Sequence, residues 1–342
     1  MPTFRIDPQR PDPEIIARAA EVLRKGGLVA FPTETVYGLG AHALDPEAVR
    51  RIYEAKGRPT YNPIIVHVAD AGRARDVARE IPERAERLAA SFWSGPLTLI
   101  LPKRDVVPDT VTAGLDAVAV RVPAHPVALA LLRAAEIPVA APSANRSTEI
   151  SPTTAAHVQK ALGDRVDLIL DGGPTSVGIE STVLDLTGAV PVILRPGAIG
   201  PRELEPVIGP VVFGGHIGRQ ESASLHRVRD EAPRASPGMM DRHYAPRARV
   251  VLFGAAERAA IAHQVQALTG EGSRVGGLLL HDLGVKMPWL MRMPGTADDY
   301  AQRLYGTLHA LDDAGCDVIV IERVPSTAEW AGVRDRLERA AG

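Results

Sequence analysis

Several polar segments of the sequence combine side chains that bind anions. The segment KGRPTYNP (56–63) contains Lys56, Arg58 and Asn62, and its two prolines limit the freedom of the backbone. A compact lysine charge beside an arginine fork suits a polyphosphate, because both groups form strong charge-assisted hydrogen bonds to phosphate oxygens. The segment therefore predicts a phosphate contact, and a solvated surface loop remains the alternative.

Hydroxyl and amide side chains are concentrated in two further segments. PTETVYGLG (32–40) follows the apolar run LVAF and contains Thr33, Thr35, Tyr37 and one acid, Glu34. PSANRSTEISPTT (142–154) carries short hydrogen-bonding side chains at Ser143, Asn145, Ser147 and Ser151. Its SPTT end is typical of a helix start, where free backbone N–H groups can meet an anion. Helix capping alone would explain the same residues.

Two arginines and two hydroxyls lie at apolar strands. Arg121 stands inside AVAVRV and Arg195 ends the strand in ILRPGAI, while Ser181 and Thr182 begin STVLDL. A buried arginine needs a carboxylate or a phosphate, so Arg121 predicts either an internal acid or an anionic ligand. The position of these groups at strand ends, where sheets commonly bind ligands, gives them more weight together than singly.

The elements that must position these residues form an α/β (α+β) pattern. Asp-Pro-Glu at 12–14 and again at 45–47 predicts a capped helix start at each place. Short apolar runs between the predicted helices indicate a large mixed sheet. Predicted strands are LVAF (28–31), PIIVHV (63–68), LTLILP (97–102), AVAVRV (117–122), IPVAAP (137–142), VDLIL (166–170), STVLDL (181–186) and PVILRP (191–196).

The chain length of 342 residues favours two domains. Residues 210–248 show no strand or helix period and are rich in arginine, glycine and proline, which predicts a linker between domains at 1–209 and 249–342. After the linker, the alternation of RVVLFG, a helix, RVGGLLL, a long helix and DVIVIERVP indicates a small Rossmann-like βαβ domain.

Composition excludes several classes of protein. The net charge is −2, which argues against a protein that holds nucleic acid by bulk charge. The one cysteine, Cys316, rules out an internal disulfide framework and fits a reducing cytoplasm, and no apolar run is long enough to span a membrane. No phosphate loop of the GxxxxGK[ST] type, HExxH motif or paired-cysteine metal site is present.

In their order along the chain, PTETVYGLG, KGRPTYNP, the PSANRS–SPT segment, STVLDL and ILRPGAI resemble the threonylcarbamoyl-AMP synthase family (the Sua5/YrdC/YwlC group). SPGM–RHYAP (from 236), followed by a small α/β domain, resembles the two-domain Sua5 form. The resemblance implies a YrdC-like twisted sheet and a nucleotidyltransferase that joins ATP, L-threonine and bicarbonate into threonylcarbamoyl-AMP with release of pyrophosphate. It also implies downstream proteins that move the threonylcarbamoyl group to adenosine 37 of tRNA (t6A), with at most a weak tRNA contact of the chain itself.

The resemblance also assigns the candidate site. For the ATP site it implies Lys56, Arg58, Asn62, Ala117, Ser143, Asn145, Ser151, Arg195 and Tyr244, with Lys56 and Arg58 as the catalytic cations. For L-threonine it implies Thr35, His67, Arg121, Ala141 and Ser181, with Arg121 pairing the α-carboxylate. In a chain with only five lysines, Lys56 suggests a position where a compact charge is required.

The chemistry fits such a site. A carbamate of threonine is already an anionic nucleophile, so its attack on the α-phosphorus of ATP needs alignment and charge neutralisation rather than a general base. We expect Mg²⁺ to arrive mainly on the ATP phosphates, because the sequence shows no carboxylate cluster.

The segment SPGMMDRHYAPR (236–247) predicts a lid that excludes water from the reactive anhydride and brings Tyr244 to the nucleotide. Met240 and Asp241 depart from the family pattern, which tends to place a lysine there. A proline-stiffened spacer is the alternative. An RNA-binding module and a carbamoyltransferase on the same sheet are the competing functions, and the low aromatic content of 4% disfavours the RNA reader.

Overall fold

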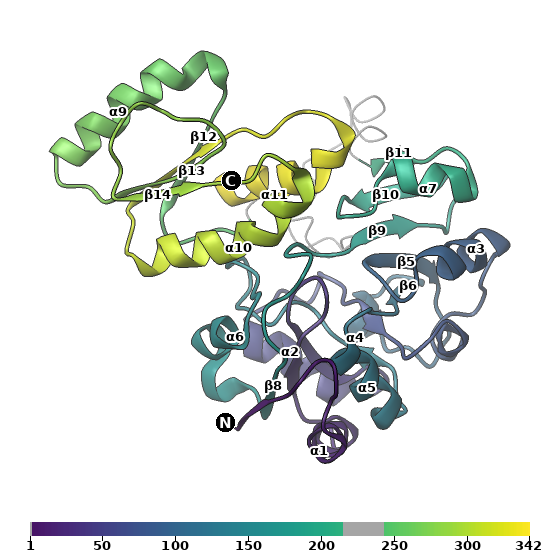
Figure 1. Ribbon diagram of the computed structural model, residues 1–342. Helices are drawn as coiled ribbons and strands as arrows, with labels where there is room; N and C mark the ends of the chain where they lie inside the picture. The colour runs from purple at the N-terminus through teal and green to yellow at the C-terminus, as the bar shows by residue number, and fades with distance from the viewer. Residues whose placement is uncertain (1, 215–242) are drawn as a thin grey trace.

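A computed structural model describes residues 2–214 and 243–342. Two sheets organise the described chain, and helices cover both (Figure 1). Residues 3–213 form an 11-stranded mixed sheet, and residues 249–322 form a four-stranded sheet. The mixed α/β fold class with a second, smaller domain is confirmed. No helix among the described residues is long and apolar enough to cross a membrane.

The large sheet has the strand order β1-β8-β2-β3-β7-β4-β6-β5-β9-β10-β11. Its strands are β1 (Thr3–Arg5), β2 (Val29–Phe31), β3 (Gly38–His42), β4 (Val66–His67), β5 (Leu97–Pro102), β6 (Ala117–Arg121), β7 (Val139–Ala140), β8 (Leu168–Asp171), β9 (Thr182–Asp185), β10 (Val192–Arg195) and β11 (Val212–Phe213). Both parallel and antiparallel pairs occur in it: β4 runs parallel to β6, for example, and antiparallel to β7.

Side chains of this sheet alternate between two cores, as the pleat requires. In β2, Val29 and Phe31 pack into one cluster with helices α1 and α5, while Ala30 packs into the other with α2 and α6. The helices are α1 (Pro13–Arg24), α2 (Pro46–Lys56), α3 (Glu83–Phe92), α4 (Asp109–Thr112), α5 (Pro126–Ala135), α6 (Ala155–Leu162) and α7 (Pro201–Ile208), with single 3₁₀ turns at Gly72–Asp76 and Gly163–Arg165.

The capped helix starts predicted from Asp-Pro-Glu are confirmed. The side chain of Asp12 accepts a hydrogen bond from the backbone N–H of Glu14, and Asp45 accepts one from Glu47. The α2 helix then ends at Lys56, and Gly57 closes it in the left-handed conformation with φ of 61°. This end of α2 is what places the KGRPTYNP segment.

The small sheet is entirely parallel, as the predicted βαβ alternation requires. Its order is β12 (Arg249–Phe253), β15 (Val318–Glu322), β13 (Val275–Leu279) and β14 (Trp289–Arg292). Helix α9 (Arg258–Gly270) covers one face, and α10 (Ala297–Asp313) and α11 (Ala331–Ala341) cover the other. Short 3₁₀ turns lie at Ala255–Glu257 and Ala328–Trp330.

The core under α10 and α11 continues into the first domain. It includes Val36, Ile150 and Ile179, which belong to loops of the large sheet, together with Tyr244 from the end of the linker. Figure 1 shows α10 and α11 on the side of the small sheet that faces the first domain. The two domains therefore meet through a shared hydrophobic core beside those loops.

The sequence interpretation did not predict four of the strands and two of the helices. The strands β1, β11 and β14 are only two to four residues long and show little periodicity, and β3 lies in the glycine-rich segment GLGAH. The two helices are the short α4 and α7. β11 pairs with β10 inside the range 210–248 that the sequence assigned to a linker. The part of that range from 215 to 242 lies outside the described residues, as do Met240 and Asp241.

Acidification is expected to weaken the contact between the domains. His157 on α6 stacks on His309 on α10, with ring centroids 3.8 Å apart. Burial is the main cause that lowers the pKa of both rings to about 4. The charge of Lys160 lowers the pKa of His157 further, and His157 lowers that of His309 further. Between the ordinary histidine pKa and pH 4 the unfolded chain therefore binds protons that the folded chain does not, so stability falls as pH falls.

The measurement is the urea midpoint of unfolding at pH 7 and at pH 5. The double variant H157Q/H309Q should lose less stability on acidification than the wild type. An equal loss in both proteins would show that the stacked pair is not responsible.

Candidate functional site

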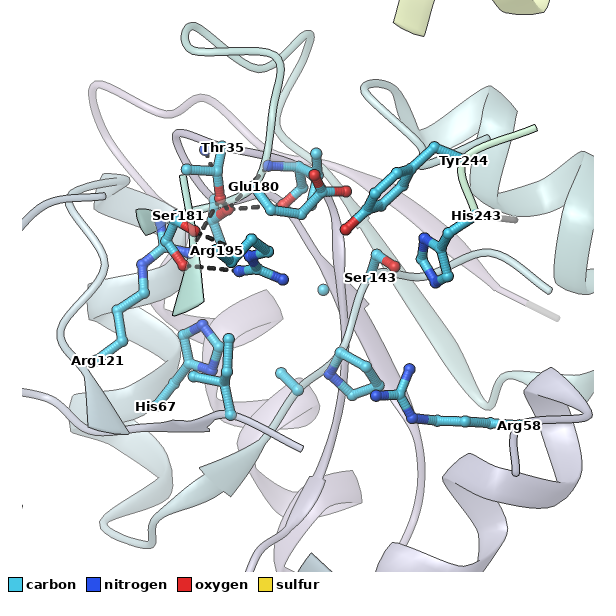
Figure 2. A pocket seen from close by; sticks show the side chains of 16 residues that line it. Thr35, Arg58, His67, Arg121, Ser143, Glu180, Ser181, Arg195, His243 and Tyr244 are labelled. Carbon is cyan, nitrogen blue, oxygen red and sulfur yellow. Dashed lines mark hydrogen bonds between the residues drawn. The ribbon is translucent and has the colours of Figure 1, made fainter. Parts of the chain in front are cut away.

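A buried cavity lies where loops of the large sheet meet the end of the linker (Figure 2). Its free volume is about 40 Å³, room for on the order of three water molecules. The lining residues are Thr33, Thr35, Val36, Gly38, Arg58, Ile65, His67, Arg121, Ala141, Pro142, Ser143, Glu180, Ser181, Arg195, His243 and Tyr244. The segments predicted from sequence to converge therefore do so.

Strand ends bring the groups at one end of the cavity together. His67 ends β4 and Arg121 ends β6, and the two residues are register partners in parallel strands. His67 is buried and its Nδ1 has no hydrogen-bond partner among the described residues. Burial and the charge of Arg121 lower the pKa of His67 to about 3, so the ring is neutral at physiological pH. It presents an unused polar atom rather than a charge.

Arg121 is held by an internal acid. Its Nη2 lies 2.6 Å from Glu34 Oε1, its Nη1 donates to Thr35 Oγ1 at 3.0 Å, and its Nε donates to the Gly95 carbonyl at 3.2 Å. The internal-acid alternative for Arg121 is thus present in the structure. Three of the five guanidinium N–H groups are used in these bonds, which fixes the side chain and leaves two N–H groups that these bonds do not use.

Ser181 and Arg195 form a second fixed pair. Arg195 Nη2 donates to Ser181 Oγ at 3.1 Å and Nε donates to the Ser181 carbonyl at 3.1 Å. The Ser181 hydroxyl also lies 2.8 Å from Thr98 Oγ1 on β5. Because β9 begins directly after Ser181 and β10 ends at Arg195, the antiparallel pairing of these strands sets the contact.

Arg58 approaches the cavity from the side opposite Arg121 (Figure 2). It is buried, and its guanidinium donates to the carbonyls of Asn62 at 3.1 Å and Pro63 at 2.8 Å. The Asn62 amide itself is fully buried, and neither its nitrogen nor its oxygen has a partner among the described residues. Both facts fit a segment shaped to receive a ligand, although Asn62 does not line the present cavity.

The Lys56 side chain points toward a neighbouring loop in this structure, and its predicted contact with the ATP phosphates stays a prediction. Its ammonium is buried and donates to the backbone carbonyls of Ser143 and Asn145 instead of lining the cavity. Burial and the charge of Arg58 hold its pKa well below the ordinary lysine value. Lys56 therefore shapes the loop that carries Ser143, and a compact three-donor ammonium suits two converging carbonyls.

Three other residues assigned to the nucleotide site do not reach the cavity as the structure stands. Asn145 donates to the Arg146 and Glu149 carbonyls and folds its own loop. Ser151 donates to Glu180 Oε1 at 2.5 Å, and Ala117 begins β6 away from the lining. Arg58, Ser143, Arg195 and Tyr244 from that group do line it, as do all five residues assigned to L-threonine.

His243 and Tyr244, the first described residues of the linker after position 242, fill the space between the domains. The Tyr244 ring is fully buried, and its hydroxyl and His243 Nδ1 have no partner among the described residues. Tyr244 has a φ of 61°, a conformation that costs a non-glycine residue energy and persists where surrounding contacts enforce it. Those contacts include the Ala245 N–H to the Thr148 carbonyl and the His243 N–H to the Arg339 carbonyl.

Positive charge exceeds negative charge around the cavity. Burial lowers the pKa of Arg58 to about 10 and also lowers that of Arg195, and each guanidinium disfavours the charge of neighbouring cations. Among the described residues neither Arg58 nor Arg195 forms an ion pair with a carboxylate, whereas Glu34 is paired with Arg121 and Glu180 with Arg336. The site is therefore built to be neutralised by an anionic ligand.

The sequence interpretation missed two lining residues that carry charge or a ring, Glu180 and His243, and one residue behind the lining, Arg336. Glu180 accepts from Ser151, Tyr305 and Arg336, and the last two belong to the second domain. Burial would raise the pKa of Glu180, but Arg336 and Arg195 outweigh it and lower the pKa to about 2. An acid adjacent to Ser181 was the available signal, but its partners were not visible in the sequence.

Two family models match the chain, one described as telomere recombination over residues 21–197 and one as the C-terminal domain of threonylcarbamoyl-AMP synthase over 199–342. A threonylcarbamoyl-AMP synthase of Pyrococcus abyssi is 44% identical over 95% of this chain and 93% of its own. One of Bacillus subtilis is 45% identical over 97% of this chain and 94% of its own.

A solved structure, Pyrococcus abyssi Sua5 complexed with L-threonine, is similar over the full length. It covers 100% of this chain and 98% of its own at 43% identity, with a TM-score of 0.90. The crystal structure of Escherichia coli YciO covers 59% of this chain and 98% of its own at 29% identity, with a TM-score of 0.55. The first likeness therefore includes both domains, whereas the second extends over about three fifths of the chain.

Proposed function

The chain belongs to the threonylcarbamoyl-AMP synthase family (the Sua5/YrdC group) and is an enzyme that forms an adenylate from L-threonine and ATP; on that premise we propose how its cavity divides between the two substrates. The observation that carries the proposal is the pair Arg58 and Arg195, two buried guanidiniums without a carboxylate partner among the described residues. Buried unpaired cations are costly, and a polyphosphate removes the cost.

L-Threonine occupies the end formed by Thr35, His67, Arg121 and Ser181. The two remaining donors of Arg121 take the α-carboxylate, and the rigid hold of Glu34 on Arg121 sets their direction. The amine, the carbamate and the side-chain hydroxyl of the bound threonine require polar contacts. These come from the unused Nδ1 of His67 and from the hydroxyls of Thr35 and Ser181. A neutral His67 is appropriate beside an arginine that must attract an anion.

ATP occupies the end formed by Arg58, Ser143 and Arg195, with Asn62 and Tyr244 beside it. Arg195 lies between the two ends of the cavity (Figure 2). The carbamate oxygen is proposed to meet the α-phosphorus beside this arginine. Threonine's amine first combines with bicarbonate and loses water to give the carbamate. The carbamate oxygen then forms a bond to the α-phosphorus while the bond to the pyrophosphate oxygen breaks. The two arginines neutralise the charge that gathers on both sides of that bond.

The present cavity is too small for a nucleotide, so the pair His243–Tyr244 must withdraw when ATP enters. Tyr244 is held in a strained conformation by contacts from both domains, which suits a segment with two discrete positions. In its closed position it excludes water from the mixed anhydride. This is the lid function that the sequence predicted, here for residues 243–247 only.

Mg²⁺ is proposed to arrive with the ATP phosphates, since both carboxylates near the cavity are engaged by arginines. It would neutralise phosphate charge there. The product is proposed to pass to tRNA threonylcarbamoyl transfer proteins in the cytoplasm, and any direct tRNA contact of this chain to be weak.

Pyrophosphate release tests the function. We expect release from ATP only when L-threonine and bicarbonate are both present, and less with L-serine, because a methyl group distinguishes the two amino acids by about 10-fold to 200-fold at most. An RNA-binding module would release no pyrophosphate, and a carbamoyltransferase would require carbamoyl phosphate. Release that is independent of the amino acid would contradict the proposal.

A further inference from the structure

One charged side chain of the C-terminal domain lies directly behind the wall of the cavity. Arg336 on α11 is fully buried, and its Nε lies 2.7 Å from Glu180 Oε2. Its Nη1 donates to the Pro196 carbonyl at 2.9 Å, so it also contacts the residue that follows Arg195. A single guanidinium of the second domain thus binds both segments that form this side of the cavity.

Arg336 also contacts the lid. Its Cζ lies 5.1 Å from the centroid of the Tyr244 ring, within the range of a cation–π interaction. Tyr305 on α10 lies against the same ring, with centroids 5.8 Å apart, and donates its hydroxyl to Glu180 Oε2 at 3.0 Å. The lid, the acid in the cavity wall and two helices of the C-terminal domain therefore form one connected cluster.

The charges of this cluster have a consequence for the nucleotide end. Glu180 interacts with two arginines, Arg336 behind the wall and Arg195 in the cavity. Arg336 takes the carboxylate directly, in a buried ion pair, while Arg195 makes its hydrogen bonds to Ser181. Without Arg336, Glu180 would be a buried anion whose nearest remaining cation is Arg195, and the two would neutralise one another. That would remove a charge on which the phosphates depend.

We propose that Arg336 is a positioning residue of the active site, which keeps Glu180 away from Arg195, so that the C-terminal domain completes the nucleotide end of the cavity. The inference rests on the proposed function, because it assigns the nucleotide to the end formed by Arg58 and Arg195. The hydrogen bonds of Arg336 go to Glu180, Pro196 and Asp335 and not to a residue assigned to L-threonine, so a smaller effect is expected at the threonine end, transmitted by the contact of Arg195 with Ser181.

The experiment compares R336M, the double variant E180Q/R336M and R336K, with E180Q to complete the double-mutant cycle. Methionine keeps the apolar stem and removes the charge. We expect R336M to raise the KM for ATP by about tenfold to hundredfold, as small displacements of substrate-aligning groups do, and to raise the KM for L-threonine less, through the contact of Arg195 with Ser181. The double variant should recover most of the affinity for ATP, because it removes the unpaired anion as well. R336K, which keeps the charge but not the fork, should lie between R336M and the wild type.

R334M is the matched control, since Arg334 lies on the same helix and its Nη1 contacts the Pro325 carbonyl. It should behave as the wild type. Calorimetric binding of ATP, measured without turnover, separates affinity from chemistry, and thermal midpoints report folding. If R336M does not fold, R336K and the double variant still provide the comparison.

Two results would overturn the inference: a double variant no better than R336M, or a loss of kcat and of both affinities in proportion to the loss of folded protein. Failure of the proposed function is distinguishable, because the wild type itself would then release no pyrophosphate with threonine and bicarbonate.

Discussion

Replacing Arg58 by methionine is expected to lower kcat/KM for ATP by about a hundredfold to a thousandfold, the cost of removing one preorganised group that stabilises transition-state charge. Arg58 is buried, it donates hydrogen bonds to the Asn62 and Pro63 carbonyls, and its pKa is lowered to about 10 by burial. The affinity for L-threonine should change little, because Arg121 holds the other end of the cavity. Steady-state pyrophosphate release, with each substrate varied in turn, is the measurement.

The R58M variant is expected to be at least as stable as the wild type, although it is less active. A cation whose folded-state pKa is lowered is less favourable in the folded chain than in the unfolded chain, so its removal is expected to keep or raise the thermal midpoint. R50M, on the helix that precedes Arg58, is the control, since Arg50 lies in an exposed pair with Glu47 and Glu54 and should affect neither property. An R58M enzyme that retains kcat/KM, or that loses activity because it unfolds, would contradict the assignment.

How far the sequence determines this site depends on the kind of contact. Arg121 and Arg195 could be predicted because they lie at or near the ends of apolar runs, and strand ends of one sheet meet at one edge; His67 was predicted from the family resemblance. The direction of Lys56 could not, because the last residue of a helix can turn toward a ligand or toward carbonyls of a neighbouring loop. Only the fold shows that the Ser143 and Asn145 carbonyls converge there.

The contacts between domains were the least predictable part. Arg336 occurs in the helical sequence AGVRDRLERAA, where arginine usually lies on a solvated face. Helical spacing places it on the same face as Val333, Leu337 and Ala340, which was the available signal, but its partner Glu180 is set by the packing of α11 on the Glu180 segment. The same holds for Glu180, whose three partners come from residues 29 to 156 positions away. Such pairs are set by tertiary structure, to which single-sequence patterns do not extend.

The largest effect on stability is expected where the two domains come closest. Gly178 has a φ of +83°, and a Cβ there would lie 2.4 Å from the Ala301 carbonyl oxygen and 2.5 Å from the Gln302 Cα on α10. The loop cannot move away freely, because the N–H groups of Val177 and Gly178 donate to the carbonyls of Glu34 and Thr35. G178A is therefore expected to cost about 2–5 kcal/mol, the sum of backbone strain and overpacking.

G173A separates these two contributions. Gly173 has a φ of +84°, but a Cβ at this position would meet no described atom within 4 Å, so the variant should show the backbone cost alone, about 1–2 kcal/mol. Urea midpoints for both variants give the comparison. G178A should in addition lose adenylate synthesis in the folded enzyme, because separating α10 from this loop displaces Tyr305 and its hydrogen bond to Glu180, two residues beyond Gly178. Equal costs at the two glycines, with synthesis intact, would show that the close approach of α10 is not what keeps the cavity wall in place.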